Sequence, residues 1–128
     1  MFEVRVESSF AAAHFLRDYH GKCENLHGHN YKVFIHVRGE ELDSGGMLFD
    51  FGELKSALRE VCAVLDHKNL NDFPIFEQNP SAERIAKFIF DKISQIIEKN
   101  PSFQSGKAEL FAVDVFETET SRARYSPF

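Results

Sequence analysis

Two histidines that stand two positions apart are the first residues of this chain that could do chemistry. They lie in His27-Gly28-His29, at the start of a run that alternates apolar and polar residues. Side chains at positions i and i+2 of a strand share one face, so both imidazoles would point the same way. A third histidine, His14, ends an earlier alternating run. Three imidazoles with one open position are typical of a catalytic zinc site, whereas a structural site uses four protein ligands.

A thiol lies close to this histidine pair in the sequence. Cys23 precedes His27 within residues 15–26, which show no sustained apolar period and are expected to form a loop. Loops often carry reactive groups. We therefore predict a Zn²⁺ site at His14, His27 and His29, with Cys23 beside it. The alternatives are two polar side chains on a solvated strand face and an incidental exposed thiol.

An aspartate and a histidine are neighbours at Asp66-His67, where a run of helical apolar spacing ends. A carboxylate beside an imidazole can fix its tautomer and stabilise its charged form, as in proton-transfer pairs. A histidine in the last turn of a helix is also favoured by the helix dipole alone. The residues by themselves favour neither interpretation.

Apolar periodicity predicts the strands and helices that would position these groups. Alternation predicts strands at 2–14, about 29–39, about 107–117 and around 122–125. Apolar steps of three and four predict two amphipathic helices, one after a cap at Asp50 and one between Ser81 and Asn100. We therefore expect an α+β fold in which two helices cover one face of a four-stranded sheet.

The third strand suggests that the second face of the sheet is also covered. Simple alternation places apolar residues on both of its faces: Phe111, Val113 and Val115 on one, and Leu110, Ala112 and Phe116 on the other. Two helices in one layer cover only one face of a sheet. A closed homo-oligomer would cover the second face and remove the exposed sheet edges.

Length and composition limit the remaining possibilities. The 128 residues suit one domain, 1–128, with 43% hydrophobic and 27% charged residues. A formal net charge of −5 argues against a nucleic-acid partner, which needs a clustered basic surface. No apolar run approaches the roughly 20 residues of a membrane span, and the N-terminus lacks a signal-peptide pattern. Cys62 lies among apolar helix positions, as a free buried thiol does. Because thiols stay reduced in the cytoplasm, we expect a cytoplasmic protein.

Six sequence islands, in order, resemble the 6-pyruvoyl-tetrahydropterin synthase and 6-carboxytetrahydropterin synthase family. The resemblance covers nearly the whole chain and rests on these segments: 10–14, 23–31, 47–51, 65–71, 79–83 and 116–118. It implies the tunnelling fold, in which the four-stranded antiparallel sheets of several subunits join into a barrel. It also implies a hexamer of two stacked trimers, with active sites between subunits.

The resemblance assigns expected roles to individual residues. It places the zinc ligands at His14, His27 and His29, the catalytic thiol at Cys23 and the proton-relay pair at Asp66 and His67. It places the carboxylate that holds the pterin ring at Glu117. Further substrate contacts are expected from Thr118, Glu83 and Ser81. Candidate cations for a triphosphate are Lys22, Lys32, Arg122 and Arg124.

The spacing within the second island resembles one branch of the family. Three residues between Cys23 and His27 resemble the 6-carboxytetrahydropterin synthases of queuosine biosynthesis. The expected reaction converts 7,8-dihydroneopterin triphosphate to 6-carboxytetrahydropterin, acetaldehyde and triphosphate. Glu24 directly follows Cys23, and related proteins with a glutamate there release 6-hydroxymethyl-dihydropterin for folate synthesis. Glu24 is therefore an alternative base, and 6-pyruvoyl-tetrahydropterin formation or a non-catalytic zinc-binding scaffold are further alternatives.

Overall fold

A long antiparallel ladder between the first two strands forms the frame of the fold. The computed structural model describes residues 1–18, 21 and 24–128. In it, β1 (Phe2–His14) and β2 (His27–Gly39) pair along their whole length, from Phe2 opposite Gly39 to His14 opposite His27. The first strand has the predicted bounds, and the second begins at His27, two residues before the predicted start. The ladder therefore brings His14 and His27 to the same end of the sheet.

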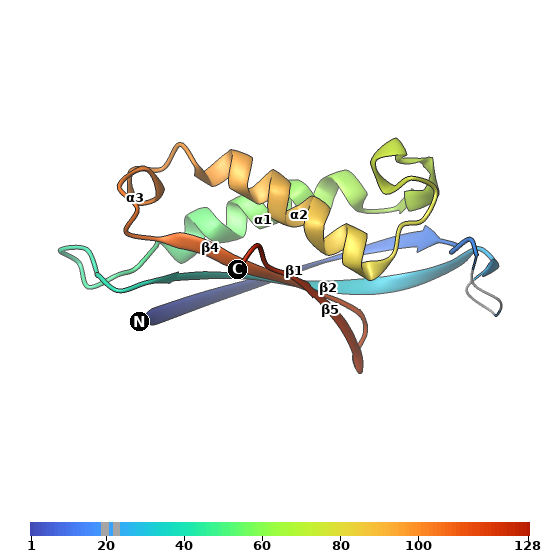
Figure 1. The fold of residues 1–128 in the computed structure, drawn as a ribbon, viewed down its shortest axis with the longest axis horizontal. Helices are drawn as coiled ribbons and strands as arrows, with labels where there is room; N and C mark the ends of the chain where they lie inside the picture. The colour runs from blue at the N-terminus through green and yellow to red at the C-terminus, as the bar shows by residue number, and fades with distance from the viewer. Residues whose placement is uncertain (19–20, 22–23) are drawn as a thin grey trace.

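The sheet has five strands, where the sequence predicted four. After the ladder, the elements are α1 (Phe51–Leu65), β3 (Lys68–Asn69), the short 3-10 turns η2 (Leu70–Asp72) and η3 (Pro74–Phe76), α2 (Ala82–Ile97), α3 (Pro101–Gln104), β4 (Glu109–Thr118) and β5 (Ser121–Tyr125). The strand order is β3-β1-β2-β4-β5. Figure 1 shows α1 and α2 together on one side of this sheet. Because β3 pairs with β1 in parallel, the sheet is mixed and not wholly antiparallel as predicted. A strand of two residues has no alternation that sequence reading could detect.

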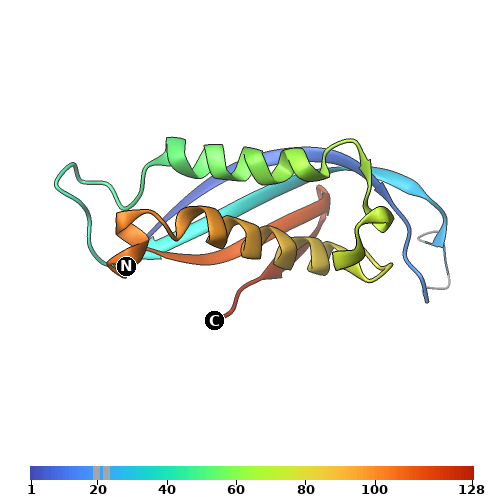
Figure 2. The same cartoon turned by 90° about the horizontal axis from the view of Figure 1, so that it is seen from above.

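The two long helices begin at the predicted caps and cover one face of the sheet. The Asp50 side chain accepts a hydrogen bond from the Glu53 N–H, and Ser81 accepts one from the Arg84 N–H. Seen from above, α1 and α2 lie side by side across the sheet (Figure 2). Their buried residues lie against apolar side chains of β1, β2 and β4 in a common core. No helix in the described ranges is both long and apolar enough to cross a membrane.

Cys62 is one of the buried residues of α1, as its apolar neighbours predicted. Its exposed fraction is 2%. Burial raises the pKa of this thiol to about 11, although a hydrogen bond with Ser8 acts in the opposite direction. Cys62 therefore stays protonated near neutral pH and packs as a small apolar side chain.

A β-bulge corrects the predicted faces of β4. Ala112 pairs with His36 and Leu110 pairs with Val37, so Phe111 is the extra residue between them. A bulge of this kind reverses the alternation on one side of it. Leu110 consequently joins Val113 and Val115 in the core, and the prediction that Phe111 shares their face is wrong.

The face of the sheet away from the helices, called the open face here, carries alternating aromatic and charged side chains. Its aromatic rings are half-buried and have cations over them: Arg5 lies 4.5 Å from the Phe34 ring centre and Arg38 lies 4.5 Å from that of Phe111. Phe34 also meets Phe116 edge to face, with ring centres 5.5 Å apart. The apolar residues of this face are thus partly covered by side chains of the same chain.

Candidate functional site

Three histidines converge at the end of the sheet where β1 stops and β2 starts. His14 is the last residue of β1, and His27 and His29 open β2 on the same face. Their potential ligand atoms all lie within 4.8 Å of one another. The ring centres are 4.6 Å apart for His14 and His27, 4.8 Å for His27 and His29, and 5.1 Å for His14 and His29. The three residues that were predicted as a metal site therefore form one cluster.

Backbone carbonyl groups orient two of these imidazoles. The Nδ1 of His14 lies 2.8 Å from the Pro80 carbonyl oxygen, and the Nδ1 of His27 lies 2.6 Å from that of Asn25. A carbonyl oxygen only accepts, so each Nδ1 carries the hydrogen and each Nε2 keeps its lone pair. A hydrogen bond from the second ring nitrogen is the usual support of a metal-binding histidine.

The cluster contains buried nitrogen atoms that no described residue satisfies. Within the described part of the chain, the Nε2 atoms of His14 and His29 have no hydrogen-bond partner. Burial lowers the pKa of both histidines; the Pro80 carbonyl partly offsets this for His14, as the Glu117 carboxylate does for His29. The imidazoles therefore stay neutral near pH 7 and keep the lone pairs that a metal needs. These residues fit a Zn²⁺ ion.

Glu117 and Tyr31 complete this end of the covered face. Glu117, near the end of β4, has one carboxylate oxygen 3.4 Å from the Nε2 of His29 and the other 3.8 Å from the Nε2 of His14. Tyr31 is fully buried and stacks on Phe10, and its hydroxyl has no partner among the described residues. Burial raises the pKa of the Tyr31 phenol, and the nearby Glu117 carboxylate raises it further, so the hydroxyl remains a donor.

Asp66 and His67 form the predicted pair at the other edge of β1. The Nδ1 of His67 lies 2.9 Å from an Asp66 carboxylate oxygen, and the second oxygen accepts the Ala11 N–H at 2.9 Å. The bond from Ala11 and the contact with His67 lower the pKa of Asp66. His67 has a left-handed φ of 56° and donates its own N–H to the Ala11 carbonyl. These contacts hold an exposed imidazole in a strained backbone position, as often occurs at functional sites.

The other predicted substrate contacts lie near Glu117 or serve the local fold. Glu83 lines a hollow of about 400 Å³ together with Glu117, Arg122 and Arg124. Ser81 caps α2, and Thr118 lies at the turn into β5, where its hydroxyl accepts the Thr120 N–H at 3.4 Å.

The candidate cations differ in their surroundings. Arg124 is held by Asp114, at 2.7 and 2.9 Å, and Arg122 lies 3.7 Å from the same carboxylate and is about half exposed. Lys32 lies 3.9 Å from Glu7 and is exposed. Arg122 also lines the hollow that contains Glu117, whereas Lys32 does not.

The predicted catalytic thiol and one candidate cation are not described. Cys23 and Lys22 lie outside the described residues. Glu24, the alternative base, is described and is exposed on the segment that leads to β2. The roles of these residues remain predictions.

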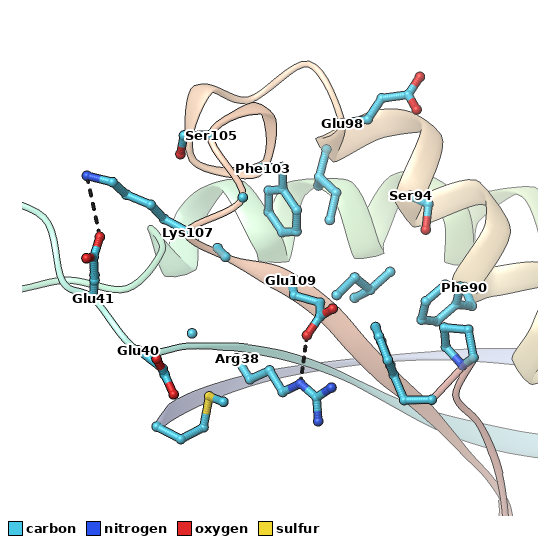
Figure 3. A pocket seen from close by; sticks show the side chains of 18 residues that line it. Arg38, Glu40, Glu41, Phe90, Ser94, Glu98, Phe103, Ser105, Lys107 and Glu109 are labelled. Carbon is cyan, nitrogen blue, oxygen red and sulfur yellow. Dashed lines mark hydrogen bonds and ion pairs between the residues drawn. The ribbon is translucent and has the colours of Figure 1, made fainter.

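A larger hollow lies at the opposite end of the sheet and contains none of the predicted site residues. Its volume is about 800 Å³, and it lies between the C-terminal end of α2, α3 and the start of β4 (Figure 3). Two of its cationic side chains already have carboxylate partners: Arg38 contacts Glu109 at 2.8 Å and Lys107 contacts Glu41 at 3.8 Å. Size therefore does not identify the reactive site in this molecule.

Sequence reasoning missed two groups that support the histidine cluster. The Pro80 carbonyl fixes the His14 ring, but a backbone acceptor leaves no mark in a sequence. The buried Asn71 side chain accepts the Phe15 N–H at 2.9 Å and donates to the Phe15 and Gln78 carbonyls, and so ties the chain after His14 to the loop before Pro80. Asn71 is the last residue of the matched segment 65–71, and this match was the one feature of the sequence that pointed to it.

Comparisons with known proteins agree with this geometry. A 6-carboxy-5,6,7,8-tetrahydropterin synthase of Synechocystis is 37% identical over 130 residues, which cover 98% of this chain and 93% of the relative. The human 6-pyruvoyl tetrahydrobiopterin synthase is 35% identical, with coverage of 96% and 90%. Both named relatives are pterin synthases.

Solved structures show the same fold. The Caenorhabditis elegans 6-pyruvoyl tetrahydropterin synthase superposes with a TM-score of 0.83 at 30% identity and covers 99% of this chain and 96% of that chain. A Plasmodium vivax 6-pyruvoyltetrahydropterin synthase, with a TM-score of 0.80, 28% identity and coverage of 97% and 96%, carries a cysteine in place of a glutamate described as a catalytic residue. Residues 3–127 match the family described as 6-pyruvoyl tetrahydropterin synthase, and this chain belongs to that family.

Proposed function

We propose that this protein is a zinc-dependent 6-carboxy-5,6,7,8-tetrahydropterin synthase acting on 7,8-dihydroneopterin triphosphate. The observation that carries the proposal is the convergence of His14, His27 and His29, with unpartnered buried Nε2 atoms, beside the Glu117 carboxylate. The named relatives support the substrate class, and the three-residue spacing between Cys23 and His27 favours the carboxy product. The products would be 6-carboxytetrahydropterin, acetaldehyde and triphosphate.

Each described residue of the site has a part in this proposal. Zn²⁺ held by the three imidazoles would supply Lewis-acid polarisation of the side-chain hydroxyls. Glu117 would accept N–H groups from the pyrimidinone edge of the pterin and so fix the position of the side chain. Asp66 would hold the His67 ring in one orientation while His67 moves protons to and from the substrate.

Cys23 is the proposed base, and Glu24 is the alternative. A thiolate near neutral pH suits removal of a weakly acidic proton from the substrate side chain. A carboxylate suits a retro-aldol cleavage that releases 6-hydroxymethyl-dihydropterin. The glutamate described as catalytic in the Plasmodium vivax relative is the observation that favours this second function.

The proposal includes a homo-oligomer with shared active sites, expected to be a hexamer of two trimers in the cytoplasm. The Asp66–His67 pair lies at the β3 edge of the sheet, and β1 separates that edge from β2, which carries His27 and His29. The His67 side chain is 82% exposed and is thus free to meet another surface. A neighbouring copy could bring its own Asp66–His67 pair to the histidine cluster of this chain.

Incubation of the protein with 7,8-dihydroneopterin triphosphate and mass analysis of the pterins tests the reaction. The wild type should form mainly 6-carboxytetrahydropterin, Cys23→Ala should form none, and Glu24→Ala should keep this product. Formation of 6-hydroxymethyl-dihydropterin alone would contradict the proposal and favour folate synthesis. Retention of zinc without any turnover would favour a binding scaffold.

Complementation tests the shared site. Two inactive variants, Cys23→Ala and His67→Asn, should regain part of the activity when co-expressed, because some interfaces then hold both intact residues. Activity that stays absent in mixed oligomers, or a monomer by light scattering, would contradict the shared site.

A further inference from the structure

Glu117 has a second set of contacts that pterin binding does not explain. Its two oxygens face the Nε2 atoms of His29 and His14 at 3.4 and 3.8 Å. Both nitrogen atoms are buried, and in the described ranges neither has a hydrogen-bond partner. The Glu117 side chain is itself only 25% exposed. A carboxylate is therefore directed at the metal-binding atoms of the cluster.

The hydrogen-bond chemistry of His14 and Glu117 favours a cation between them. The Nδ1 of His14 carries the hydrogen, because it faces the Pro80 carbonyl, so its Nε2 can only accept. A carboxylate also only accepts. Two acceptors that face each other in a partly buried site repel, unless a positive charge lies between them.

The observed separations suit a shared metal ion. Zn²⁺ binds imidazole nitrogen and carboxylate oxygen at about 2.0–2.2 Å, so two ligands of a tetrahedral site lie about 3.4 Å apart. One Glu117 oxygen lies 3.4 Å from the His29 Nε2, which equals this value, and the other lies 3.8 Å from the His14 Nε2. Among the described residues, the ligand atoms within 4.8 Å of one another are those of the three histidines, so the Glu117 carboxylate lies beside the place of a fourth ligand and would turn to take it.

We propose that Glu117 is the fourth metal ligand in the substrate-free protein and leaves the metal when a pterin enters. This inference rests on the proposed metal site and adds a second role to the pterin-holding carboxylate. A carboxylate whose two oxygens accept two parallel N–H bonds from the pyrimidinone edge is turned away from the metal. Pterin binding therefore opens the coordination position that the substrate hydroxyls need, and the site stays closed until the substrate is present.

Metal affinity is the first test, with Glu117→Gln as the variant. Glu119→Gln is the matched control, because Glu119 is an exposed carboxylate at the turn between β4 and β5. Competition with a chelator should show Zn²⁺ affinity lowered about tenfold or more in Glu117→Gln and unchanged in Glu119→Gln. Circular dichroism checks that both variants are folded.

The absorption of the Co²⁺-loaded protein is the second test, and it reports the coordination directly. The visible bands of Glu117→Gln should differ from those of the wild type. Neopterin, a pterin without phosphate groups, should change the bands of the wild type when it binds. Equal affinity and identical bands in wild type and Glu117→Gln, or wild-type bands that do not respond to bound neopterin, would overturn the inference.

The failure of the metal site itself is a separate outcome. A wild type that binds neither Zn²⁺ nor Co²⁺ would contradict the proposed function. Metal binding that is lost in His29→Ala but unaffected in Glu117→Gln would contradict only the role of Glu117.

Discussion

Both faces of the sheet bury histidine nitrogen atoms, but the two faces arrange them differently. On the open face, the Nε2 of His36 lies 2.8 Å from Asp114, and Arg124 binds the same carboxylate at 2.7 and 2.9 Å. On the face covered by the helices, His14 and His29 keep buried Nε2 atoms that no described residue satisfies. Both histidine groups are buried on strands of the same sheet, so burial alone does not distinguish them.

The difference between the two faces, among the described residues, is whether the unpartnered nitrogen atoms gather in one cluster. Buried polar groups in folded proteins are almost always paired, and each exception needs an explanation. On the open face the His36 Nε2 is paired with Asp114, and the unpartnered His36 Nδ1 lies 3.6 Å from the Glu3 carboxylate. On the covered face the two unpartnered Nε2 atoms belong to three clustered histidines, and one added cation would pair both of them.

The largest expected effect comes from removing one histidine from each face. His29→Ala should lower the metal content from about one ion per chain to none and abolish turnover. His36→Ala should retain the metal, because its ring contacts Asp114 and not the cluster. Elemental analysis of both purified variants measures this. Metal retained in His29→Ala, or lost in a folded His36→Ala, would remove the distinction between the faces.

A substitution of His67 tests the role of the β3 edge of the sheet. His67→Asn should lower turnover roughly 10²–10⁴-fold, as expected for a lost acid–base group, and leave the metal content unchanged. Asparagine is chosen because it tolerates the left-handed φ of 56° at this position. Lys68→Ala, at the next exposed residue, is the control for steady-state kinetics. Full activity in His67→Asn would leave Asp66 and His67 with a structural role.

Substitutions of Leu110 and Phe111 test the assignment of Leu110 to the covered face and of Phe111 to the open face. Leu110→Ala should lower the free energy of unfolding by about 2–5 kcal/mol, because it opens a cavity in the core. Phe111→Ala should cost about 1–2 kcal/mol, since this half-buried ring lies on the open face beneath Arg38. Urea unfolding of both variants measures the difference. A larger loss of unfolding free energy in Phe111→Ala than in Leu110→Ala would contradict the assignment of these residues to the two faces.

The smallest expected effect is a pH dependence that arises on the open face. Burial alone would raise the pKa of Asp114, but hydrogen bonds from Arg124 and His36 outweigh it and hold this pKa below 3.8. The unfolded chain then binds more protons than the folded one below pH 3.8, and the contribution of Asp114 is lost as the pH falls.

The stability difference between wild type and Asp114→Asn should therefore be largest at pH 7 and shrink toward pH 3. Urea midpoints at pH 7, 4 and 3 measure it, with Glu119→Gln as the control carboxylate. A difference that stays constant with pH would show that the pairing of Asp114 does not depend on its charge.

The sequence predicted the parts of this molecule that follow from regular periodicity. The bounds of β1, the Asp50 and Ser81 caps and the common face of His27 and His29 all follow from local rules of strands and helices. His14 was placed on the apolar face by alternation alone, and it is fully buried there.

The features that the sequence did not predict depend on tertiary contacts. No glycine or proline near Phe111 in the sequence indicates the bulge. The bulge places Leu110 and Phe111 on the faces opposite to those that simple alternation predicted. The two-residue strand β3 directly follows His67, whose N–H donates to the Ala11 carbonyl and brings the chain alongside β1. The unpartnered state of the His14 and His29 nitrogen atoms also becomes visible only when every neighbouring group has been placed.

The pairing of His14 with His27 at the end of the β1–β2 ladder fixes the two points that the connection between these strands must join. The free energy of closing a connection grows slowly, by about 0.6 kcal/mol for each doubling of its length, so insertions of one or two residues between the strands are inexpensive. An insertion between Cys23 and His27 would move the thiol, and with it Glu24, relative to the three imidazoles without disturbing them. Length variation in this segment is therefore a route by which one metal-binding framework can acquire a different reaction.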